Sequence, residues 1–502
     1  MNFNVSIWTK DNFPIVEIKD FYFEEGKINF LFGESGIGKS LISKAIYGIL
    51  NPFDLNIYIN NKSYFQYLNT AYVSEIRKNG FFVFQETSTH LNPTLKISEQ
   101  LEEGDLSEFS SQFLDDFKYL FYGKKEEFIS FLSHSYPKPH RPSGGEKQRI
   151  LASMAIKKMQ LLIEKNSYSN LNLFVFDEPS GNLDDKYRDL LFDLIVKKYL
   201  KGNFTILFIT HDYSLIGKIY SQYENLLTRA KFLELRKEES GLSLVEFNSR
   251  NYLDWLKSFP EGYLNQNKTD FELLKIYPDL QIFGRKLSIV KDKEKFEKKD
   301  LTINKGQIVY LKAESGMGKT SLAKAICGLI KPDKIKARIW GTTIDENTKF
   351  EFYRDRLWGK KIAMCFQHSD EALNLNDLTY QAFEPFIKNK TYLEKTDLIE
   401  KNLFKAFDYE TTKIIFKRKI KHLSGGQKQK INLLRSFLSP AEIIILDEPI
   451  SGMDFESVKK TFDIIKNELQ NRGILLISHN EEIFSKAVGS ENIFYLVENE
   501  QD

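Results

Sequence analysis

The chain repeats itself, and this internal repeat constrains its fold more than any other feature. Five short blocks occur twice in the same order, 280 to 282 residues apart over the first three blocks and about 270 apart over the last two. Such ordered repetition indicates two homologous domains, with one insertion in the first copy, expected over residues 156–170. The blocks are Gly33–Ser40 and Ala313–Thr320, Phe84-Gln85 and Phe366-Gln367, Pro142–Gln148 and Leu423–Gln429, Phe176–Pro179 and Leu446–Pro449, and Thr210-His211 and Ser478-His479.

The blocks also set the expected domain boundaries. The first domain is expected over residues 1–247, because residues 232–247 have a strand, turn and strand pattern. The second domain is expected over residues 280–502. Residues 248–279 form a polar connector with Pro260, Gly262 and Pro278, predicted to be a linker with about one helical turn.

The composition excludes several classes of protein. Lys and Arg number 71 against 69 Asp and Glu, whereas a chain that coats nucleic acid normally has a clear basic excess. Two cysteines are too few for a disulfide framework or an all-cysteine zinc site. No apolar run approaches the ~18 residues of a membrane-spanning helix, and the first residues lack the layout of a signal peptide. We therefore expect a soluble protein of a reducing compartment, with no nucleic-acid partner.

Two glycine-rich blocks have the sequence context of phosphate-binding loops. In the first copy, residues 27–32 have the pattern of a short apolar strand, and an amphipathic helix pattern starts at Lys39. Glycines let backbone N–H groups point at phosphates, and the helix N-terminus adds the positive end of its dipole. The lysine neutralises the β- and γ-phosphates, and the next hydroxyl ligates Mg²⁺. The expected nucleotide-binding residues are Gly33, Ser35, Gly36, Gly38, Lys39 and Ser40, and Ser315, Gly316, Gly318, Lys319 and Thr320.

Each copy also has an apolar strand that ends in two acids. A fully apolar strand is typical of the centre of a parallel sheet. The first acid, at the carboxyl end of the strand, can hold the water shell of Mg²⁺. The second acid lies just outside the strand, where a carboxylate can orient or deprotonate an attacking water. We therefore expect Asp177 and Asp447 at the metal, together with Ser40 and Thr320, and Glu178 and Glu448 as catalytic residues.

A histidine follows a further apolar strand in each copy, at His211 and His479. A single histidine at a strand end is more often a capped or half-buried residue. Its repetition 34 and 32 residues after the first acid favours a catalytic role for both. No role is assigned to His90, His134 and His140, and Cys327 and Cys365 are expected in the hydrophobic cores.

Taken together, these residues resemble the ATP-binding cassette (ABC) superfamily. Leu423–Gln427 matches the family signature, and Gly181–Asp184 and Gly452–Asp454 resemble its D-loop. The resemblance covers the chain outside residues 248–279. It assigns Lys39 and Lys319 to Walker A, Asp177 and Asp447 to Walker B, Glu178 and Glu448 to the catalytic glutamate, His211 and His479 to the switch histidine, and Gln85 and Gln367 to the Q-loop as further metal ligands.

The resemblance implies tandem α/β P-loop NTPase domains. Each would have a RecA-like α/β core, an antiparallel β subdomain and a helical arm, the arms spanning about residues 88–140 and 369–419. Each ATP would lie between the Walker A loop of one domain and the signature of the other, since a serine and two glycines before a helix form a second anion cradle. Phe13 is expected to stack on adenine in the first copy, and no aromatic residue is assigned in the second. The signature residues expected at the nucleotide are Ser143, Gly144 and Gly145, and Ser424, Gly425, Gly426 and Gln427.

The two composite sites are expected to be unequal. The site that joins Lys39 and Glu178 to the second signature fits the family pattern throughout. In the other site, Pro142 replaces the signature leucine, Glu146 the glutamine and Ala313 the first loop glycine. Proline is acceptable before a helix, alanine requires a negative φ, and Glu146 adds negative charge near the phosphates. This second site is therefore expected to hydrolyse ATP more slowly.

The residues after Gln85 indicate a branch of the family. His90–Leu101 is similar to the peptide and nickel importer ATPases, and residues 372–378 are a looser match. This resemblance implies an ATPase that uses ATP and Mg²⁺ to power separate transmembrane permease subunits, with or without a solute-binding protein. It implies import of peptides, nickel or a similar small solute, and a cytoplasmic location, peripheral at the inner face of the cell membrane. The cysteine cluster that ends some such ATPases is missing.

Three other functions fit parts of this pattern. A soluble tandem-cassette translation factor acting on the ribosome shares the motif order, but its long charged helical linker fits the proline-containing connector poorly. DNA-repair relatives carry a long coiled-coil insertion, for which the 104 residues from Lys39 to Ser143 leave no room. A regulatory pair that binds ATP without turnover is disfavoured by the two Asp-Glu pairs.

Overall fold

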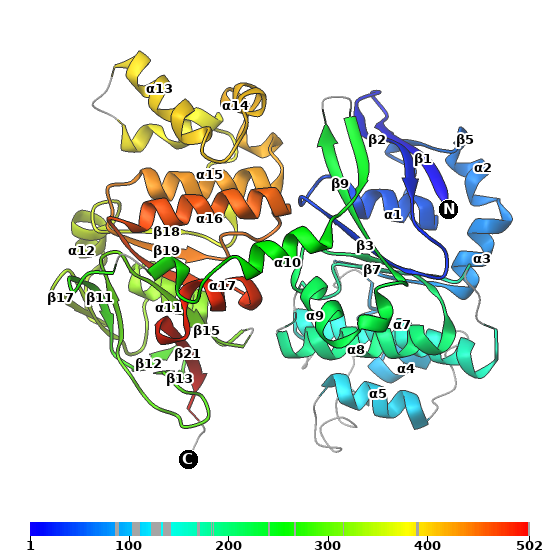
Figure 1. Ribbon diagram of the computed structural model, residues 1–502, viewed down its shortest axis with the longest axis horizontal. Helices are drawn as coiled ribbons and strands as arrows, with labels where there is room; N and C mark the ends of the chain where they lie inside the picture. The colour runs from blue at the N-terminus through cyan, green and yellow to red at the C-terminus, as the bar shows by residue number, and fades with distance from the viewer. Residues whose placement is uncertain are drawn as a thin grey trace. The chain divides into compact units, whose positions relative to one another are not determined.

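The computed structural model divides the chain into two compact units, residues 1–249 and 250–502 (Figure 1). Each unit has its own hydrophobic core and its own α/β sheet. The structure describes residues 1–85, 90–102, 111–121, 132–133, 142–167, 171–181, 183, 185–238, 241–265, 268–314, 316–387 and 391–499.

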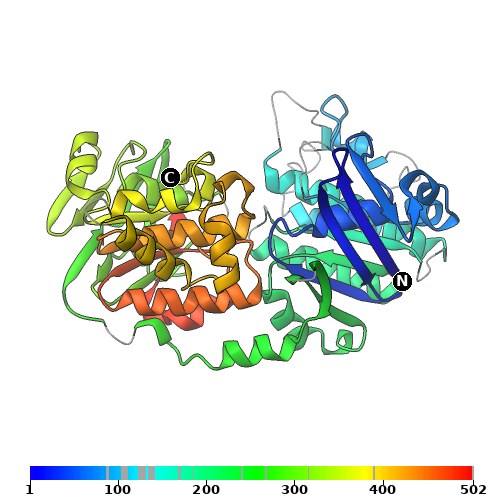
Figure 2. The same cartoon turned by 90° about the horizontal axis from the view of Figure 1, so that it is seen from above.

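Unit 1 is built on a sheet whose order, in the part of the chain that the structure describes, is β5-β4-β1-β2-β10-β9-β3-β8-β7-β6. Strands β9, β3, β8, β7 and β6 run parallel, and β5, β4, β1 and β2 pair antiparallel. The strands nearest the N-terminus are the dark blue arrows in Figure 2. The strands β3, β7 and β8 are buried throughout, as expected for parallel strands covered on both faces. The strands are β1 (Asn2–Thr9), β2 (Pro14–Tyr22), β3 (Ile28–Gly33), β4 (Leu55–Ile59), β5 (Lys62–Ser63), β6 (Phe81–Val83), β7 (Leu173–Asp177), β8 (Thr205–Ile209), β9 (Ala230–Glu238) and β10 (Gly241–Glu246).

The helices of unit 1 include one that starts directly after the first glycine-rich loop. This helix, α1, packs Ile42 and Ile46 into the core. Helices α4 and α5 lie in the expected first arm, and the rest of that arm, with His134 and His140, lies outside the described residues. The helices are α1 (Lys39–Tyr47), α2 (Tyr64–Leu68), α3 (Ala71–Asn79), α4 (Ile97–Glu102), α5 (Ser111–Phe121), α7 (Gly144–Glu164), α8 (Asp185–Gly202), α9 (Ser214–Gln222) and the 3-10 helix η3 (Glu224–Leu226).

Unit 2 has two sheets in its described residues. The larger has the order β12-β13-β21-β15-β20-β19-β18, and the smaller, β14-β11-β16-β17, is antiparallel. Strands β21, β15, β20, β19 and β18 run parallel, as their counterparts do in unit 1. The strands are β11 (Glu272–Ile276), β12 (Asp279–Ile282), β13 (Arg285–Val290), β14 (Leu301–Asn304), β15 (Ile308–Lys312), β16 (Lys336–Ile339), β17 (Thr342–Asp345), β18 (Ile362–Cys365), β19 (Ile443–Asp447), β20 (Gly473–Ile477) and β21 (Ile493–Glu498).

In Figure 1, α13 and α14 of unit 2 form a separate layer beside α15, in the region expected for the second helical arm. Thr391 caps the N-terminus of α13, and Asp408 caps the N-terminus of α14. In each case a side-chain oxygen accepts a backbone N–H of the first helical turn. The helices are α10 (Ser249–Lys257), α11 (Lys319–Ile326), α12 (Phe350–Phe352), α13 (Tyr392–Leu403), α14 (Tyr409–Phe416), α15 (Gly425–Leu438), α16 (Phe455–Leu469) and α17 (Glu481–Val488), with short 3-10 or π turns η4 (Tyr263–Asn265), η5 (Tyr353–Leu357), η6 (Ser369–Glu371), η7 (Thr379–Ala382), η8 (Glu384–Phe386), η9 (Ile420–His422) and η10 (Ser490–Asn492).

The segment expected to be a connector has more structure than its sequence suggested. Helix α10, the turn η4 and strand β11 all lie within residues 248–279, and from Arg250 onward this segment belongs to unit 2. Leu273, Leu274 and Ile276 of β11 are buried. Unit 2 therefore begins well before the boundary expected at residue 280, because β11 is needed to complete its antiparallel sheet.

The predicted fold class is confirmed: both units are P-loop α/β domains with an antiparallel β part and added helices. The thiols of Cys327 and Cys365 are buried, as predicted, and burial raises the pKa of Cys327 to about 12. Within the described ranges, no helix is both long and apolar enough to cross a membrane.

Candidate active site

The first glycine-rich loop connects β3 to α1 and holds its lysine close to its own backbone. The Lys39 Nζ donates to the Gly33 carbonyl at 2.6 Å and to the Glu34 carbonyl at 3.0 Å, and the residue is buried. Gly33 has φ +140°, and a Cβ there would lie 2.6 Å from the Leu235 carbonyl oxygen. Gly36 and Gly38 also have positive φ, a conformation that favours glycine. These glycines therefore set the loop backbone in a shape that leaves the lysine ammonium at its centre.

The second loop, between β15 and α11, repeats this arrangement with one change. The Lys319 Nζ donates to the Ala313 carbonyl at 2.6 Å and the Glu314 carbonyl at 3.3 Å. Ala313 is not among the residues with positive φ, whereas Gly316 and Gly318 are. The alanine is thus free of the strain that it would meet at Gly33. Ser315, expected at the phosphates, lies outside the described residues.

The first acid of unit 1 faces the loop hydroxyl. The Ser40 Oγ donates to the Asp177 Oδ1 at 2.7 Å, and Asp177 is fully buried at the end of β7. Burial raises the pKa of Asp177 to about 6, against the lowering effect of the Ser40 hydrogen bond. Its Oδ2 accepts no hydrogen bond within the described part of the chain. A buried carboxylate oxygen without a partner, next to a hydroxyl, is an oxygen donor set of the kind that Mg²⁺ prefers, so these residues fit the metal.

The corresponding acid of unit 2 is also buried and open to a ligand. Neither oxygen of Asp447 accepts a hydrogen bond from the residues that the structure describes. Burial raises the pKa of Asp447 above its ordinary value, although the side chain of Thr320 partly lowers it. Gln85 and Gln367 are exposed, two residues after β6 and β18. Their expected role at the metal stays a prediction.

The second acids share an unusual backbone conformation. Glu178 and Glu448 have φ +47° and +50°, the left-handed region that residues with a Cβ rarely adopt. Each is fixed there by a backbone N–H bond, from Glu178 to the Ile209 carbonyl at 3.0 Å and from Glu448 to the Ile477 carbonyl at 2.9 Å. Such strain costs on the order of 1–3 kcal/mol and is concentrated at functional sites. It occurs at the same position in both units, and the catalytic role expected for these glutamates stays a prediction.

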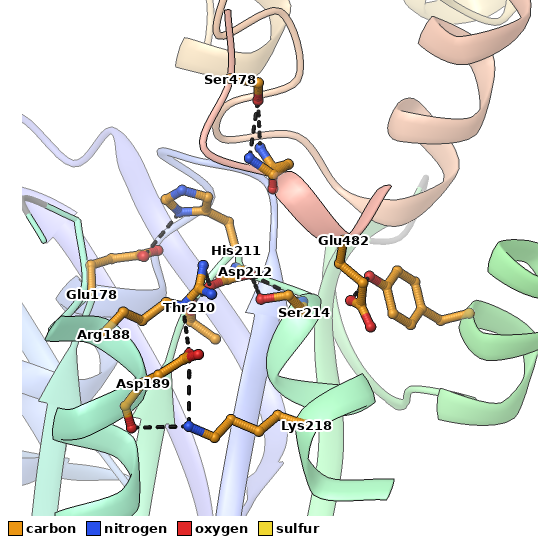
Figure 3. Close-up of polar contacts among 12 residues, drawn as sticks. Glu178, Arg188, Asp189, Thr210, His211, Asp212, Ser214, Lys218, Ser478 and Glu482 are labelled. Atoms are coloured by element: carbon orange, nitrogen blue, oxygen red, sulfur yellow. Dashed lines mark hydrogen bonds and ion pairs between the residues drawn. The ribbon is translucent and has the colours of Figure 1, made fainter. Parts of the chain in front are cut away.

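In unit 1 the glutamate and the switch histidine form a close pair (Figure 3). The His211 Nδ1 and the Glu178 Oε2 are 2.9 Å apart. Burial would raise the pKa of Glu178, but the charge and hydrogen bond of His211 outweigh it and leave that pKa below its ordinary value. The charge of Glu178 in turn raises the pKa of His211. The pair therefore stabilises a glutamate in its charged form.

Residues around His211 hold its segment in place. The Thr210 Oγ1 accepts the backbone N–H of Asp212 at 2.9 Å. Arg188 of α8 forms an ion pair with Asp212 at 3.2 Å, and the Ser214 Oγ donates to the same aspartate at 2.5 Å (Figure 3). Arg188 had no role in the sequence interpretation, because no sequence signal connects it to a histidine twenty-three residues later.

In unit 2 the equivalent pair is wider. The His479 Nε2 lies 3.8 Å from the Glu448 Oε1, beyond hydrogen-bond distance. The Ser478 Oγ instead donates to the Glu448 Oε2 at 3.1 Å. Burial raises the pKa of Glu448 to about 7. The two glutamates thus have the same place in the fold and different electrostatic surroundings.

The two signature blocks cap the N-termini of α7 and α15 in the same way. The Ser143 Oγ accepts the Glu146 backbone N–H at 3.2 Å, and the Glu146 Oε2 accepts the Ser143 backbone N–H at 2.6 Å. Ser424 and Gln427 make the same reciprocal pair at 3.2 and 3.1 Å. This is a capping box, which accepts either glutamate or glutamine. Glu146, expected only to add unfavourable charge, therefore also has a structural role. The glycines Gly144, Gly145, Gly425 and Gly426 form the first turns of these helices.

A glutamine in each signature helix, part of the repeated blocks, had no predicted role. The Gln429 Nε2 donates to the carbonyls of Phe366 and Glu448, both at 3.3 Å. Gln148 donates to the Phe84 carbonyl at 3.4 Å. These glutamines connect the signature helix to the strand end before the Q-loop. Their repetition five residues after the signature serine was the available sequence signal.

Two exposed phenylalanines lie in hairpin turns, one in each unit. Phe13, predicted to stack on adenine, precedes β2 and is 68% exposed. In unit 2, Phe283 lies between β12 and β13 and is 71% exposed. Two residues later, the Arg285 Nη1 donates to the Gly316 carbonyl of the second loop at 2.8 Å. Phe283 was missed, because the copies align poorly before their glycine-rich blocks.

Comparison with known proteins bears on the same residues. A family model described as ABC transporter matches residues 16–164 and 296–451. The ribose import ATP-binding protein RbsA of Caldanaerobacter subterraneus is 22% identical over 94% of this chain and 89% of its own length. The peptidoglycan transport ATP-binding protein YejF of Agrobacterium fabrum is 23% identical over 93% of this chain and 85% of its own length.

Solved structures share the fold. A structure described as RNase-L inhibitor matches 98% of this chain and 89% of its own, with a TM-score of 0.57 and 17% identity. The archaeal ribosome recycling factor aABCE1, solved with the ribosomal stalk protein aP1, gives the same values. At this identity the likeness extends to the fold alone.

Proposed function

The chain belongs to the ABC transporter family and is a tandem-cassette ATPase, and from this premise we propose that it powers transport through separate transmembrane permease subunits. The observation that carries the proposal is the presence, in both units, of a phosphate loop, a buried metal-ready aspartate and a strained catalytic glutamate. The full-length relatives named for ribose import and peptidoglycan transport support it. The chain would then act in the cytoplasm, at the inner face of the cell membrane.

In the proposed mechanism each loop lysine gives up its bonds to its own carbonyls and binds nucleotide phosphates. Lys39 and Lys319 each donate a local bond of this kind at 2.6 Å, which phosphate oxygens can replace. Ser40 with Asp177, and Thr320 with Asp447, would hold Mg²⁺, which when bound neutralises charge on the phosphates. Glu178 and Glu448 would orient the attacking water and accept its proton. His211 keeps Glu178 ionised for this task.

We further propose that the signature residues at the starts of α7 and α15 bind nucleotide phosphates. The capped N-termini of α7 and α15 support this, because an ordered helix N-terminus binds anions. Phe13 and Phe283 would stack on adenine, since both are exposed and the strands that follow them place Val16 beside Gly38 and Leu287 beside Gly318 of the phosphate loops.

The cargo is proposed to be a small imported solute. The segment after Gln85 favours peptides or nickel, whereas the relatives are named for ribose and peptidoglycan. The alternative, a soluble factor acting on the ribosome, has the likeness of fold to the ribosome recycling factor in its favour.

The test is affinity purification of the tagged full chain from detergent-solubilised native cells, with identification of the proteins that accompany it. Polytopic membrane proteins, with or without a solute-binding protein, are the expected result, and their genes would point to the solute. Recovery of ribosomal proteins in their place would overturn the transporter proposal in favour of the alternative.

A further inference from the structure

Helix α10, which follows the last strand of unit 1, and the turn after it form hydrogen bonds with α17 from its first turn to its end. Helix α17 is the helix that follows His479. The Tyr252 Oη in α10 donates to the Glu482 Oε2 in the first turn of α17 at 2.8 Å. The Lys486 Nζ donates back to the Leu256 carbonyl at 3.1 Å, near the C-terminus of α10. Beyond α10, the Asn265 Nδ2 donates to the Val488 carbonyl at 2.7 Å, at the end of α17.

Aromatic side chains of α10 also pack against α16, the helix that follows the second D-loop. Trp255 packs edge-on against Phe455 and Phe462, with ring centroids 5.4 Å apart in each case. Tyr252, which is fully buried, packs edge-on against Phe455 at 5.5 Å. Phe455 is the first residue of α16, directly after the capping Asp454. Helix α10 therefore holds the starts of the two helices that follow the D-loop and the switch histidine.

Hydrogen bonds also fix the backbone segment between this contact and Glu448. The Ser478 Oγ accepts the Asn480 backbone N–H at 3.1 Å and donates to the Glu448 Oε2 at 3.1 Å. The Ser478 carbonyl accepts the Tyr310 hydroxyl at 2.8 Å, and Glu481 pairs with Lys312 at 2.7 Å. The segment from Ser478 to Glu482 is thus fixed by β15 on one side and by Tyr252 on the other.

Unit 1 does not hold its own switch segment in this way. The residues equivalent to Glu481 and Glu482 are Tyr213 and Ser214, and those equivalent to Tyr310 and Lys312 are Phe30 and Phe32. There, Phe32 stacks on Tyr213 with centroids 4.8 Å apart. At these two positions unit 1 has no carboxylate, and its switch segment is instead held by Asp212, which pairs with Arg188 at 3.2 Å.

We propose that Tyr252 is a positioning residue for the second catalytic pair, acting through Glu482 to fix the segment that carries Ser478 and His479. The segment between the two cassettes would therefore set the rate of hydrolysis in the second cassette and not in the first. The proposal rests on ATP hydrolysis by this chain and does not depend on what the ATPase powers, so a failed search for permease subunits leaves it standing.

The test compares Tyr252→Phe, which removes only the hydroxyl, with the wild-type full chain. Loss of a hydrogen bond to a charged group costs enough to make local opening about tenfold easier. We expect hydrogen exchange over residues 477–488 to become about tenfold faster. In a Glu178→Gln background, where the second cassette supplies the remaining turnover, we expect kcat for ATP to fall two- to fivefold, with KM unchanged within about twofold. The matched control is Tyr199→Phe in unit 1, which removes an equally buried hydroxyl that donates to the Gly26 carbonyl at 2.6 Å. It should change neither quantity.

Three further variants separate positioning from general loss of stability. Glu482→Gln keeps an acceptor oxygen and should retain kcat, whereas Glu482→Leu should match Tyr252→Phe. Adding Tyr252→Phe to Glu482→Leu should cause no further loss, because both remove the same bond. In a Glu448→Gln background, Tyr252→Phe should leave the remaining turnover unchanged. Unchanged exchange and kcat in Tyr252→Phe, or an equal fractional loss in the Glu448→Gln background, would overturn the proposal.

Discussion

At the scale of single residues, the two glutamates predicted to be catalytic have the same sequence neighbours and different partners. Glu178 pairs closely with His211, whereas Glu448 is held by Ser478 with His479 at 3.8 Å. Repetition of the Asp-Glu block predicted both positions. It could not predict the difference, because the partners come from another strand and depend on side-chain geometry.

This difference leads to a prediction about turnover. Replacing Glu178 by Gln should lower steady-state ATP hydrolysis more than replacing Glu448 by Gln, because the first pair keeps its glutamate charged while burial raises the pKa of the second to about 7. The measurement is phosphate release at pH 7 and saturating ATP and Mg²⁺. Equal and complete loss of turnover in both variants would contradict unequal sites.

The loops allow a second prediction at this scale. Gly33→Ala should destabilise unit 1 by about 1–3 kcal/mol and weaken ATP binding, because φ is +140° and the new Cβ would meet the Leu235 carbonyl at 2.6 Å. The matched change, Ala313→Gly in unit 2, should be tolerated. Thermal denaturation and titration with a fluorescent ATP analogue measure both effects. A Gly33→Ala variant as stable as the wild type would show that the loop backbone can relax.

At the scale of elements, the signature helices show why one position tolerates two residue types. Glu146 and Gln427 close the same capping box. Glu146→Gln should therefore leave the stability of unit 1 nearly unchanged, whereas Glu146→Ala should cost about 1 kcal/mol. Chemical denaturation of the two variants measures this. A loss of stability in Glu146→Gln as large as that in Glu146→Ala would contradict the capping role.

The arm of unit 2 carries a prediction that depends on pH. Asp408 caps α14 by accepting the Thr411 backbone N–H at 2.8 Å, and this bond lowers the pKa of its carboxyl. A lowered pKa in the folded state means that the charged form stabilises the fold above the ordinary pKa, near 4, and that this contribution is lost as pH falls through the folded value. Asp408→Ala should therefore speed hydrogen exchange in α14 at pH 7. The difference in exchange rate between Asp408→Ala and the wild type should shrink as the pH is lowered toward 3. A difference that stays constant with pH would contradict the capping role of the ionised carboxyl.

Elements with regular patterns were predictable from the sequence, and irregular ones were not. The apolar strands β7, β8, β19 and β20 and the helices after the glycine-rich loops lie where the sequence placed them. Helix α10 and β11 were expected as a linker. Their composition is polar and contains prolines, so the few residues that become buried give no regular pattern. The contacts that order these elements, such as that of Tyr252 with Glu482, join positions 230 residues apart.

At the scale of the whole molecule, two complete cassettes in one chain agree with the sequence repeat and with the family match over residues 16–164 and 296–451. The repeat alone established two domains, because five blocks do not recur by chance in the same order at near-constant spacing. It could not establish the cargo, because the residues that contact a solute belong to other subunits in the proposed assembly. It also could not show that the segment between the cassettes belongs to the second.

The most direct measurement of the central claim is ATP hydrolysis by the chain together with the membrane proteins that co-purify with it, reconstituted in liposomes. We predict that hydrolysis in this complex is accompanied by solute movement, and that both are lost in the double variant Glu178→Gln with Glu448→Gln. Hydrolysis that proceeds at the same rate with or without the membrane proteins, and with no solute moved, would contradict the claim.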